Sequence, residues 1–415
     1  MRKKTFGVLM SSLFVTGGKR LSGEIYVSGS KNAALPLLFS TIAINGVSTL
    51  SGVPDIGDVR VALLILEEFG ASVSRFGSTL VIDTRNLKYC KPSVELVGKI
   101  RASTYLLGSM LARFSRAEIY NFGGCNFCAR PIDMHLYALQ SLGARLEGDT
   151  LVAEKLRGAD IFFEKASVGA TINALILASA ADGVSRIFGY AREPHVLSLV
   201  SFLRSAGIKI SLCDEYLEIE GGKPVSGTIA VIPDMIEAGT YIILSLITDS
   251  ELLIRGADVG HLTSLLTTLA HAGANFKIDD EGILPFGKIK SPIKIETAPH
   301  PGFPTDLQPQ MAPLLAVFSG GEITESVWQK RFGYLRELEK LGVAYEICDD
   351  TAKIMKSKLR CGVSTAPDLR GGAALLIAAL YASGQSEIKN AEILFRGYEN
   401  LEEKLSSIGA MVERK

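Results

Sequence analysis

Hydrophobic and polar positions repeat along the chain in one pattern that occurs six times. In each copy a leucine-rich helical pattern ends at a glycine, and a strand with alternating apolar residues follows. The copies read LEEFGASVSR, LQSLGARLEG, LRSAGIKISL, LAHAGANFKI, LEKLGVAYEI and LSSIGAMVER, with glycines at Gly70, Gly143, Gly207, Gly273, Gly342 and Gly409. This spacing predicts six repeats of about 68 residues.

Each of these glycines is expected to end a helix in the left-handed conformation, which glycine adopts without strain. Each repeat also contains an earlier segment that is almost wholly apolar. A helix that is apolar on all sides is buried on all sides, so every repeat is predicted to hold a buried inner helix. The predicted inner helices are residues 32–43, 103–114, 170–181, 239–248, 311–320 and 372–384.

The ends of the repeat pattern predict how the domains are connected. The sixth copy stops at AMVERK without its second strand, whereas the N-terminal residues form strand patterns that belong to no copy. We therefore expect residues 1–30 plus 233–415 to form one discontinuous domain, and residues 31–232 to form an inserted domain with the cysteine-containing segment 121–133. An open solenoid is less favoured, because solenoid units are usually about 20 to 45 residues long.

Composition and charge exclude several classes of protein. The chain has 415 residues, and its 44 Lys and Arg balance its 44 Asp and Glu, so no overall charge favours nucleic acid or an anionic membrane. No run of about 18 apolar residues is present, so no membrane-spanning helix is expected. The basic, apolar N-terminus outlines a signal peptide, but strand patterns continue directly from it. Six scattered cysteines favour reduced thiols and a cytoplasmic protein.

Charged and polar residues stand at the start of each predicted inner helix. They are Lys31 and Asn32, Arg101, Lys165 with Ser167 and Gly169, Asp234 and Glu237, Asp306, and Asp368 with Arg370. Each one alone is explained by a solvated surface charge or a helix cap. Because they recur at about one repeat length, we expect them at equivalent positions, where helix N-termini favour anionic ligands.

The segment GGCNFCARPID contains two cysteines, Cys125 and Cys128, three residues apart. A zinc site needs further ligands, and the sequence offers only His135 nearby. A redox pair normally begins a helix in a βαβ unit, whereas glycines precede Cys125. The remaining interpretations are one reactive cysteine, with Lys31 and Arg130 as cations that stabilise its thiolate, or an inert buried thiol.

Eight collinear motifs resemble those of the UDP-N-acetylglucosamine 1-carboxyvinyltransferase family of enolpyruvyl transferases. They are SGSKNAA, RAST, GGC…ARPID, SVGAT, AREP, PHPGFPTD, DLRGGA and RGYENLEEKL. The resemblance implies a two-domain inside-out α/β barrel with three βαβαββ units in each domain and buried inner helices. The sister family that makes enolpyruvylshikimate phosphate shares the repeat, but it lacks the cysteine segment.

The resemblance implies transfer of the enolpyruvyl group of phosphoenolpyruvate to the 3-hydroxyl of UDP-N-acetylglucosamine, with release of phosphate. These two small molecules are the expected partners, and no metal or organic cofactor is implied. We expect a monomer or a weak oligomer. Fosfomycin, an epoxide analogue of phosphoenolpyruvate, is expected to alkylate Cys125. A shikimate-type transferase and a catalytically silent sugar-nucleotide binding protein are the alternatives.

The resemblance also implies the site residues. The implied catalytic residues are Cys125, Asp306, Lys31, Arg396, Asp368 and Arg370. The implied substrate-binding residues are Lys31, Asn32, Arg101, Arg130, Pro131, Ile132, Asp133, Met134, Lys165, Ala166, Ser167, Val168, Gly169, Asp306 and Val327. Cys128 departs from the family pattern, because many relatives have glycine there.

Overall fold

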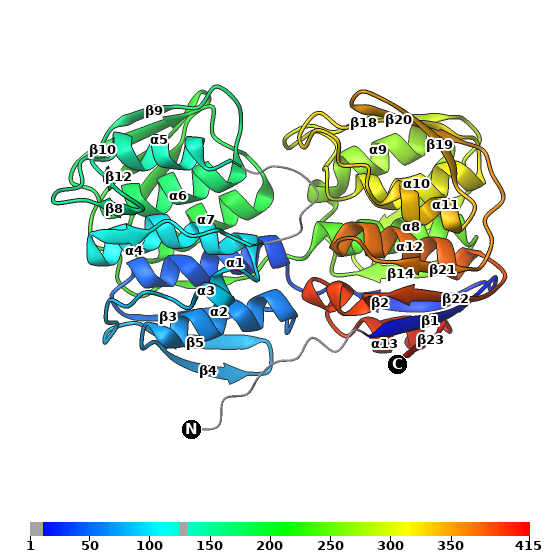
Figure 1. Cartoon of the computed structure of the whole chain (residues 1–415), viewed down its shortest axis with the longest axis horizontal. Coiled ribbons are helices and arrows are strands. Elements are labelled where there is room, and N and C mark those ends of the chain that lie inside the picture. The colour runs from blue at the N-terminus through cyan, green and yellow to red at the C-terminus, as the bar shows by residue number, and fades with distance from the viewer. Residues whose placement is uncertain (1–10, 124–130) are drawn as a thin grey trace. The chain divides into compact units, whose positions relative to one another are not determined.

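A computed structural model of the chain describes residues 11–123 and 131–415. The chain divides into two compact units, whose elements are labelled in Figure 1. The inserted unit comprises Ser28–Asp234 and Pro299–Pro301. The terminal unit comprises the residues through Val27, Met235–Ala298 and Gly302–Lys415. The division into domains at residues 1–30 plus 233–415 and 31–232 stays a prediction.

The described residues of the inserted unit form three inner helices, each followed along the chain by an outer helix. The inner helices are α1 (Lys31–Ser40), α4 (Leu106–Phe114) and α6 (Val168–Ala178), and the outer helices are α2 (Gly57–Glu68), α5 (Asp133–Ser141) and α7 (Pro194–Ser205). The short helix α3 (Val94–Val97) and the 3₁₀ helices η1 (Thr41–Ala43) and η2 (Arg101–Tyr105) lie between them in the sequence.

The strands that the structure describes in this unit form three sheets around these helices, and Figure 1 shows the strands toward the outside of the unit. The first sheet has the order β13 (Thr228–Ala230), β3 (Val47–Ser51), β5 (Thr79–Asp83) and β4 (Ser72–Phe76). The second has the order β6 (Arg116–Glu118), β8 (Thr150–Val152) and β7 (Arg145–Glu147). The third has the order β11 (Lys209–Leu212), β12 (Tyr216–Glu220), β10 (Val184–Phe188) and β9 (Asp160–Phe162).

The terminal unit has the same plan. Its inner helices are α8 (Met235–Ile247), α10 (Gln308–Val317) and α12 (Leu369–Tyr381). Its outer helices are α9 (Thr263–His271), α11 (Leu335–Lys340) and α13 (Leu401–Ser407), and its 3₁₀ helices are η3 (Val259–Leu262) and η4 (Ala391–Arg396).

The sheets of the terminal unit include strands from both ends of the chain. The first has the order β15 (Ala274–Asp279), β16 (Gly282–Gly287), β14 (Glu251–Arg255) and β2 (Ser22–Tyr26). The second has the order β17 (Ile293–Glu296), β18 (Gly321–Thr324), β20 (Thr351–Met355) and β19 (Ala344–Cys348). The third has the order β21 (Val363–Thr365), β22 (Gly384–Lys389), β1 (Ser12–Gly17) and β23 (Met411–Arg414). Strand β1 is antiparallel to both neighbours, with Leu13 opposite Ile388 and Arg414, and so completes the last repeat.

The predicted inner helices and helix-ending glycines are confirmed. Residues Ala170–Ala178 of α6 and Leu369–Leu380 of α12 are buried throughout. All six repeat glycines have positive φ, from 84° at Gly409 to 112° at Gly273. The strand pattern is less regular than a strict βαβαββ repeat, because the β6–β8–β7 sheet has three strands in the described residues, whereas the other five sheets have four.

Within residues 11–123 and 131–415, none of the helices combines the length and the apolar character that crossing a bilayer requires. The four cysteines in these ranges, Cys90, Cys213, Cys348 and Cys361, are free thiols.

The burial of the inner helices generates a stability prediction. Leu37 of α1 is fully buried, whereas Leu64 of the outer helix α2 is 43% exposed. Leu37→Ala is expected to lower the free energy of unfolding by about 2 to 5 kcal/mol, because it leaves a cavity among packed side chains. Leu64→Ala is the matched control, with an expected loss of less than about 1 kcal/mol. Urea unfolding of the full chain measures both, and equal losses would contradict the inner-helix assignment.

Candidate active site

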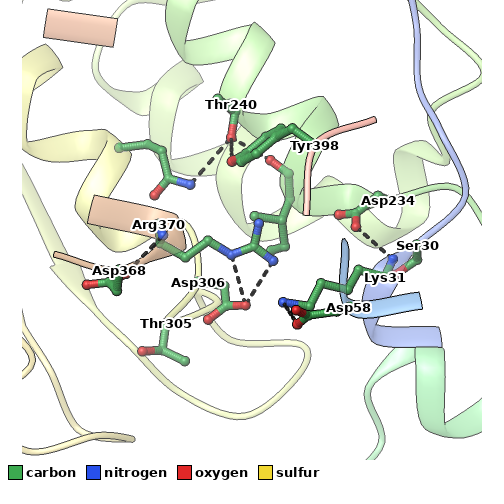
Figure 2. Close-up of polar contacts among 12 residues, drawn as sticks. Ser30, Lys31, Asp58, Asp234, Thr240, Thr305, Asp306, Asp368, Arg370 and Tyr398 are labelled. Carbon is green, nitrogen blue, oxygen red and sulfur yellow. Dashed lines mark hydrogen bonds and ion pairs between the residues drawn. The ribbon is translucent and has the colours of Figure 1, made fainter. Parts of the chain in front are cut away.

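Several of the predicted site residues lie at inner-helix starts, and each unit contains its own group of them. In the inserted unit, Lys31 is the first residue of α1, and the Ser30 side chain caps this helix by accepting from the Ala33 N–H. The Lys31 N–H donates to Asp234 Oδ2 over 3.1 Å, and its Nζ lies 2.8 Å from Asp58 Oδ2 (Figure 2). The ammonium is therefore aligned at a helix N-terminus by a nearly buried carboxylate.

Asp58 was not among the residues predicted from sequence. It lies in the first turn of α2, and its side chain is only 4% exposed. An acidic residue in the first turn of a helix is usually explained by the helix dipole. The sequence therefore did not indicate that Asp58 pairs with Lys31, 27 residues earlier. Asn32 follows Lys31 on α1 and is partly buried.

A second group in the inserted unit lies where η2, α5 and α6 meet. The Asn173 amide donates to the Thr104 carbonyl over 3.1 Å and to His135 Nδ1 over 2.8 Å, and its oxygen accepts from the Gly108 N–H. His135 Nδ1 accepts this bond, which assigns the ring proton of the neutral imidazole to Nε2. A Cβ added at Gly169 would lie 2.6 Å from His135 Cε1, so only glycine allows α6 to pack this closely.

This cluster brings together many of the residues predicted to bind the nucleotide. Arg101 begins η2, Asp133 and Met134 begin α5 beside Pro131 and Ile132, and Val168 and Gly169 begin α6. Ser167 is the N-cap of α6 and accepts from the Ala170 N–H, whereas Lys165 is exposed and Ala166 partly buried just before it. Cys125, Cys128 and Arg130 lie outside the described residues.

The terminal unit contains a carboxylate held between two buried arginines. Arg331 Nη1 donates to Asp306 Oδ1 over 3.0 Å. Arg370 donates to Asp306 Oδ2 from Nε over 3.2 Å and lies 3.1 Å away through Nη2 (Figure 2). Both arginine side chains are 4% exposed, whereas the Asp306 side chain is 27% exposed. The carboxylate is thus fixed by two cations and still reachable by a ligand.

Arg370 is itself held by its own helix. Asp368 is the N-cap of α12 and accepts from the N–H groups of Arg370 and Gly371 at 2.9 and 3.0 Å. The guanidinium lies 5.9 Å from the centre of the Tyr398 ring, and the Tyr398 hydroxyl shares a 2.9 Å hydrogen bond with Thr240 (Figure 2). Arg396 ends η4, two residues before Tyr398, and is partly buried.

Arg331 and Glu325 are two residues of this group that the sequence interpretation missed. Arg331 lies between β18 and α11, in a segment whose composition looks like that of any polar loop. Glu325 follows β18 and is fully buried, and its Oε1 accepts from the N–H of Val327, the predicted nucleotide contact, over 3.0 Å. Their partners are 25 and 20 residues away along the chain at Asp306 and Thr305, which no local spacing rule indicates.

The groups in the two units differ in what they can do chemically. A fixed and accessible carboxylate can accept a proton from a hydroxyl group of a ligand. A lysine at a helix N-terminus and partly buried arginines can bind carboxylate or phosphate oxygens. Among the residues that the structure describes, no group of three or more His, Cys, Asp or Glu side chains could hold a metal ion.

The buried histidine generates a pH prediction. Burial lowers the pKa of His135 from 6.5 to about 4, with the charge of Arg101 acting in the same direction and Asp133 against it. The unfolded chain binds a proton at His135 below about pH 6.5, whereas the native chain stays neutral there to about pH 4. The free energy of unfolding is therefore expected to fall by up to about 3 kcal/mol between pH 7 and pH 4 through this group.

Urea unfolding of the wild type and of His135→Gln across this range measures the effect. His135→Gln is expected to be less stable at pH 7, with a stability difference from the wild type that narrows as the pH falls. A constant difference across the range would contradict the assignment of a neutral, buried His135.

Comparisons with known proteins show which family this chain resembles. The family model for EPSP synthase (3-phosphoshikimate 1-carboxyvinyltransferase) matches residues 15–405. The chain is 40% identical over 418 residues to the UDP-N-acetylglucosamine 1-carboxyvinyltransferase of Clostridium botulinum, with 98% of this chain and 100% of the relative covered. It is 39% identical over 414 residues to the protein of the same name from Halothermothrix orenii, with the same coverage of both chains.

Solved structures show the same fold. The enolpyruvyl transferase NikO from Streptomyces tendae superposes with a TM-score of 0.88 at 26% identity, covering 98% of this chain and 99% of that one. An EPSP synthase from Acinetobacter baumannii superposes with a TM-score of 0.71 at 17% identity, covering 98% of this chain and 100% of that one, which supports the fold alone. The chain has the enolpyruvyl transferase fold, and by its full-length relatives it belongs to the UDP-N-acetylglucosamine 1-carboxyvinyltransferase family.

Proposed function

We propose that this chain transfers the enolpyruvyl group of phosphoenolpyruvate to the 3-hydroxyl of UDP-N-acetylglucosamine and releases phosphate. The full-length similarity to transferases of that name supports the substrates. The observation that carries the chemistry is the Asp306 carboxylate, which is fixed by Arg331 and Arg370 at the start of an inner helix and remains partly exposed.

The reaction that the family resemblance implies is an addition followed by an elimination. In the addition, the sugar 3-oxygen bonds to C2 of phosphoenolpyruvate, the hydroxyl proton passes to a base, and an acid protonates the methylene carbon. In the elimination, the C2–O bond to phosphate breaks and a proton leaves the new methyl group, which restores the double bond. Atoms balance without a metal or an organic cofactor, because the activated group arrives on phosphoenolpyruvate.

In the terminal unit, Asp306 is the proposed base for the 3-hydroxyl. Arg331 and Arg370 bond to both carboxylate oxygens, which fixes the orientation of the carboxylate. Asp368 supports Arg370 through its backbone N–H, and Arg396 is the proposed cation for phosphoenolpyruvate. Val327 is the proposed contact to the sugar nucleotide.

In the inserted unit, Lys31 and Asn32 are proposed to bind phosphoenolpyruvate at the start of α1. Arg101, Pro131 to Met134 and Lys165 to Gly169 are proposed to hold the nucleotide, because most of them border the His135–Asn173 cluster. Cys125 is the proposed acid for the methylene carbon, and Arg130 is a proposed substrate cation. Both lie outside the described residues, so their roles rest on the family resemblance alone.

The proposal extends to cellular context. We expect a cytoplasmic reaction, in keeping with four free thiols in the described residues, and a chain that acts as a monomer or a weak oligomer. The shikimate-type reaction remains the second candidate, because the matching family model is that of EPSP synthase.

An acceptor assay tests the proposed function. Phosphate release from phosphoenolpyruvate is expected with UDP-N-acetylglucosamine and not with 3-phosphoshikimate. Asp306→Ala is expected to lower kcat by at least about 100-fold, because the hydroxyl loses its base. Asp280→Ala, in the exposed turn between β15 and β16, is the matched control and should retain the wild-type rate. Release only with 3-phosphoshikimate, or with neither acceptor, would refute the proposal.

Alkylation by fosfomycin tests the cysteine assignment separately. Intact-mass and peptide analysis of protein incubated with fosfomycin and UDP-N-acetylglucosamine should show one adduct, located on Cys125. The adduct is expected to persist in Cys128→Ser and to vanish in Cys125→Ser, because a thiolate is needed to open the epoxide. An adduct on Cys128, or none on an active enzyme, would contradict the assignment.

A further inference from the structure

Glu325 is a fully buried carboxylate with no role in the chemistry proposed above, yet it accepts four hydrogen bonds. Burying a carboxylate costs several kcal/mol unless cations and hydrogen bonds compensate for the lost water. The partners of Glu325 therefore indicate which parts of the structure the buried carboxylate holds in place. They fall into two groups, one for each carboxylate oxygen.

The first oxygen organises the segment after β18. Glu325 Oε1 accepts from the N–H groups of Val327 and Trp328 at 3.0 and 2.9 Å and from the Thr297 hydroxyl at 2.7 Å. The Thr297 hydroxyl in turn accepts from the Ser326 N–H over 2.9 Å. This side of Glu325 fixes the backbone at Val327, the proposed contact to the sugar nucleotide.

The second oxygen leads to the proposed base. Glu325 Oε2 accepts from the Thr305 hydroxyl over 2.7 Å. With its proton directed at Glu325, the Thr305 hydroxyl presents a lone pair to Arg331 Nη1, which donates to it over 2.9 Å. The same Nη1 lies 3.0 Å from the Thr305 carbonyl and from Asp306 Oδ1, so one of its two hydrogens is shared between acceptors. Three short contacts thus join Glu325 to Asp306.

Charge balance supports the same connection. Arg331 and Arg370 place two guanidinium groups, each 4% exposed, around the single carboxylate of Asp306. Glu325 supplies a second negative charge one hydroxyl group away from Arg331. Arg331 is therefore held between two carboxylates, and its orientation toward Asp306 depends on both.

We propose that Glu325 is a positioning residue that couples the nucleotide-binding segment at Val327 to the orientation of the Asp306 carboxylate, through Thr305 and Arg331. This inference rests on the proposed function. It assigns Glu325 a larger effect on turnover than on nucleotide affinity. The reason is that the segment at Val327 bonds to Oε1 of Glu325, whereas the contacts that lead through Thr305 to Asp306 begin at Oε2.

Two threonines provide a matched pair of variants. Thr305 and Thr297 each donate to Glu325 over 2.7 Å, but only Thr305 also contacts Arg331. Thr305→Val and Thr297→Val remove the same hydroxyl group and keep the shape of the side chain. Because displacements of about 1 Å in a catalytic group cost up to about 100-fold in rate, Thr305→Val is expected to lower kcat at least about 10-fold. Thr297→Val acts on the segment at Val327, so it is expected to change the dissociation constant for UDP-N-acetylglucosamine and to lower kcat less than Thr305→Val does.

Two further variants separate positioning from folding. Thr305→Ser keeps the hydroxyl group and is expected to restore kcat to within about threefold of the wild type. Glu325→Gln can keep its amide oxygen toward Val327, Trp328 and Thr297, but its NH₂ group then faces the Thr305 hydroxyl and leaves that proton without its acceptor. Glu325→Gln is therefore expected to lower kcat as Thr305→Val does, and the double variant should be no slower than either single one.

The experiment measures kcat, the dissociation constant for UDP-N-acetylglucosamine by calorimetry, and the melting temperature for each full-length variant. The inference predicts low kcat with a dissociation constant within about threefold of wild type for Thr305→Val and Glu325→Gln. It is overturned if Thr305→Val and Thr297→Val lower kcat to the same extent for the same loss of melting temperature. It is also overturned if Thr305→Ser fails to restore turnover. Absence of turnover in the wild type would instead refute the proposed function.

Discussion

The burial of two guanidinium groups around one carboxylate is the constraint on which the terminal unit depends. Arg331 and Arg370 are removed from water, so their donors must find acceptors inside the protein. Asp306 takes one bond or more from each, Thr305 takes two from Arg331, and the Tyr398 ring lies near Arg370. Removing any partner leaves a charge poorly compensated, which explains why so many polar groups are fixed at this place.

The fold explains why such groups gather at helix starts. The inner helices are enclosed by outer helices and sheets, so their sides carry mostly apolar residues, and most of the charged groups lie at their N-terminal ends. Those ends also offer free N–H groups and a partial positive charge. Lys31 on α1 and Asp368 with Arg370 on α12 use this position in the two units, each with a buried carboxylate as partner or cap.

The repeat architecture could be predicted from the sequence because it depends on local rules. A glycine at φ near 100° ends each outer helix, and an apolar segment becomes each inner helix, whatever the rest of the chain does. Lys31, Asp306 and Arg370 were found because they stand at those helix starts and match family motifs. Asp58, Glu325 and Arg331 were not found from the sequence. Each lies in an ordinary helix start or loop, and only its contact with a partner 20 to 27 residues away links it to the site. The three-stranded sheet β6–β8–β7 was not predicted for a similar reason. The number of strands in a sheet depends on which strands pair, and not on the repeated sequence pattern.

The central claim is that Asp306, held by Arg331 and Arg370, receives the proton of the acceptor hydroxyl. A crystal structure of the protein with UDP-N-acetylglucosamine bound tests it most directly. The account predicts that the sugar 3-hydroxyl lies within about 3 Å of an Asp306 carboxylate oxygen, with both arginine contacts retained. A 3-hydroxyl directed at another side chain, or an Asp306 carboxylate turned away from the sugar in the complex, would contradict it.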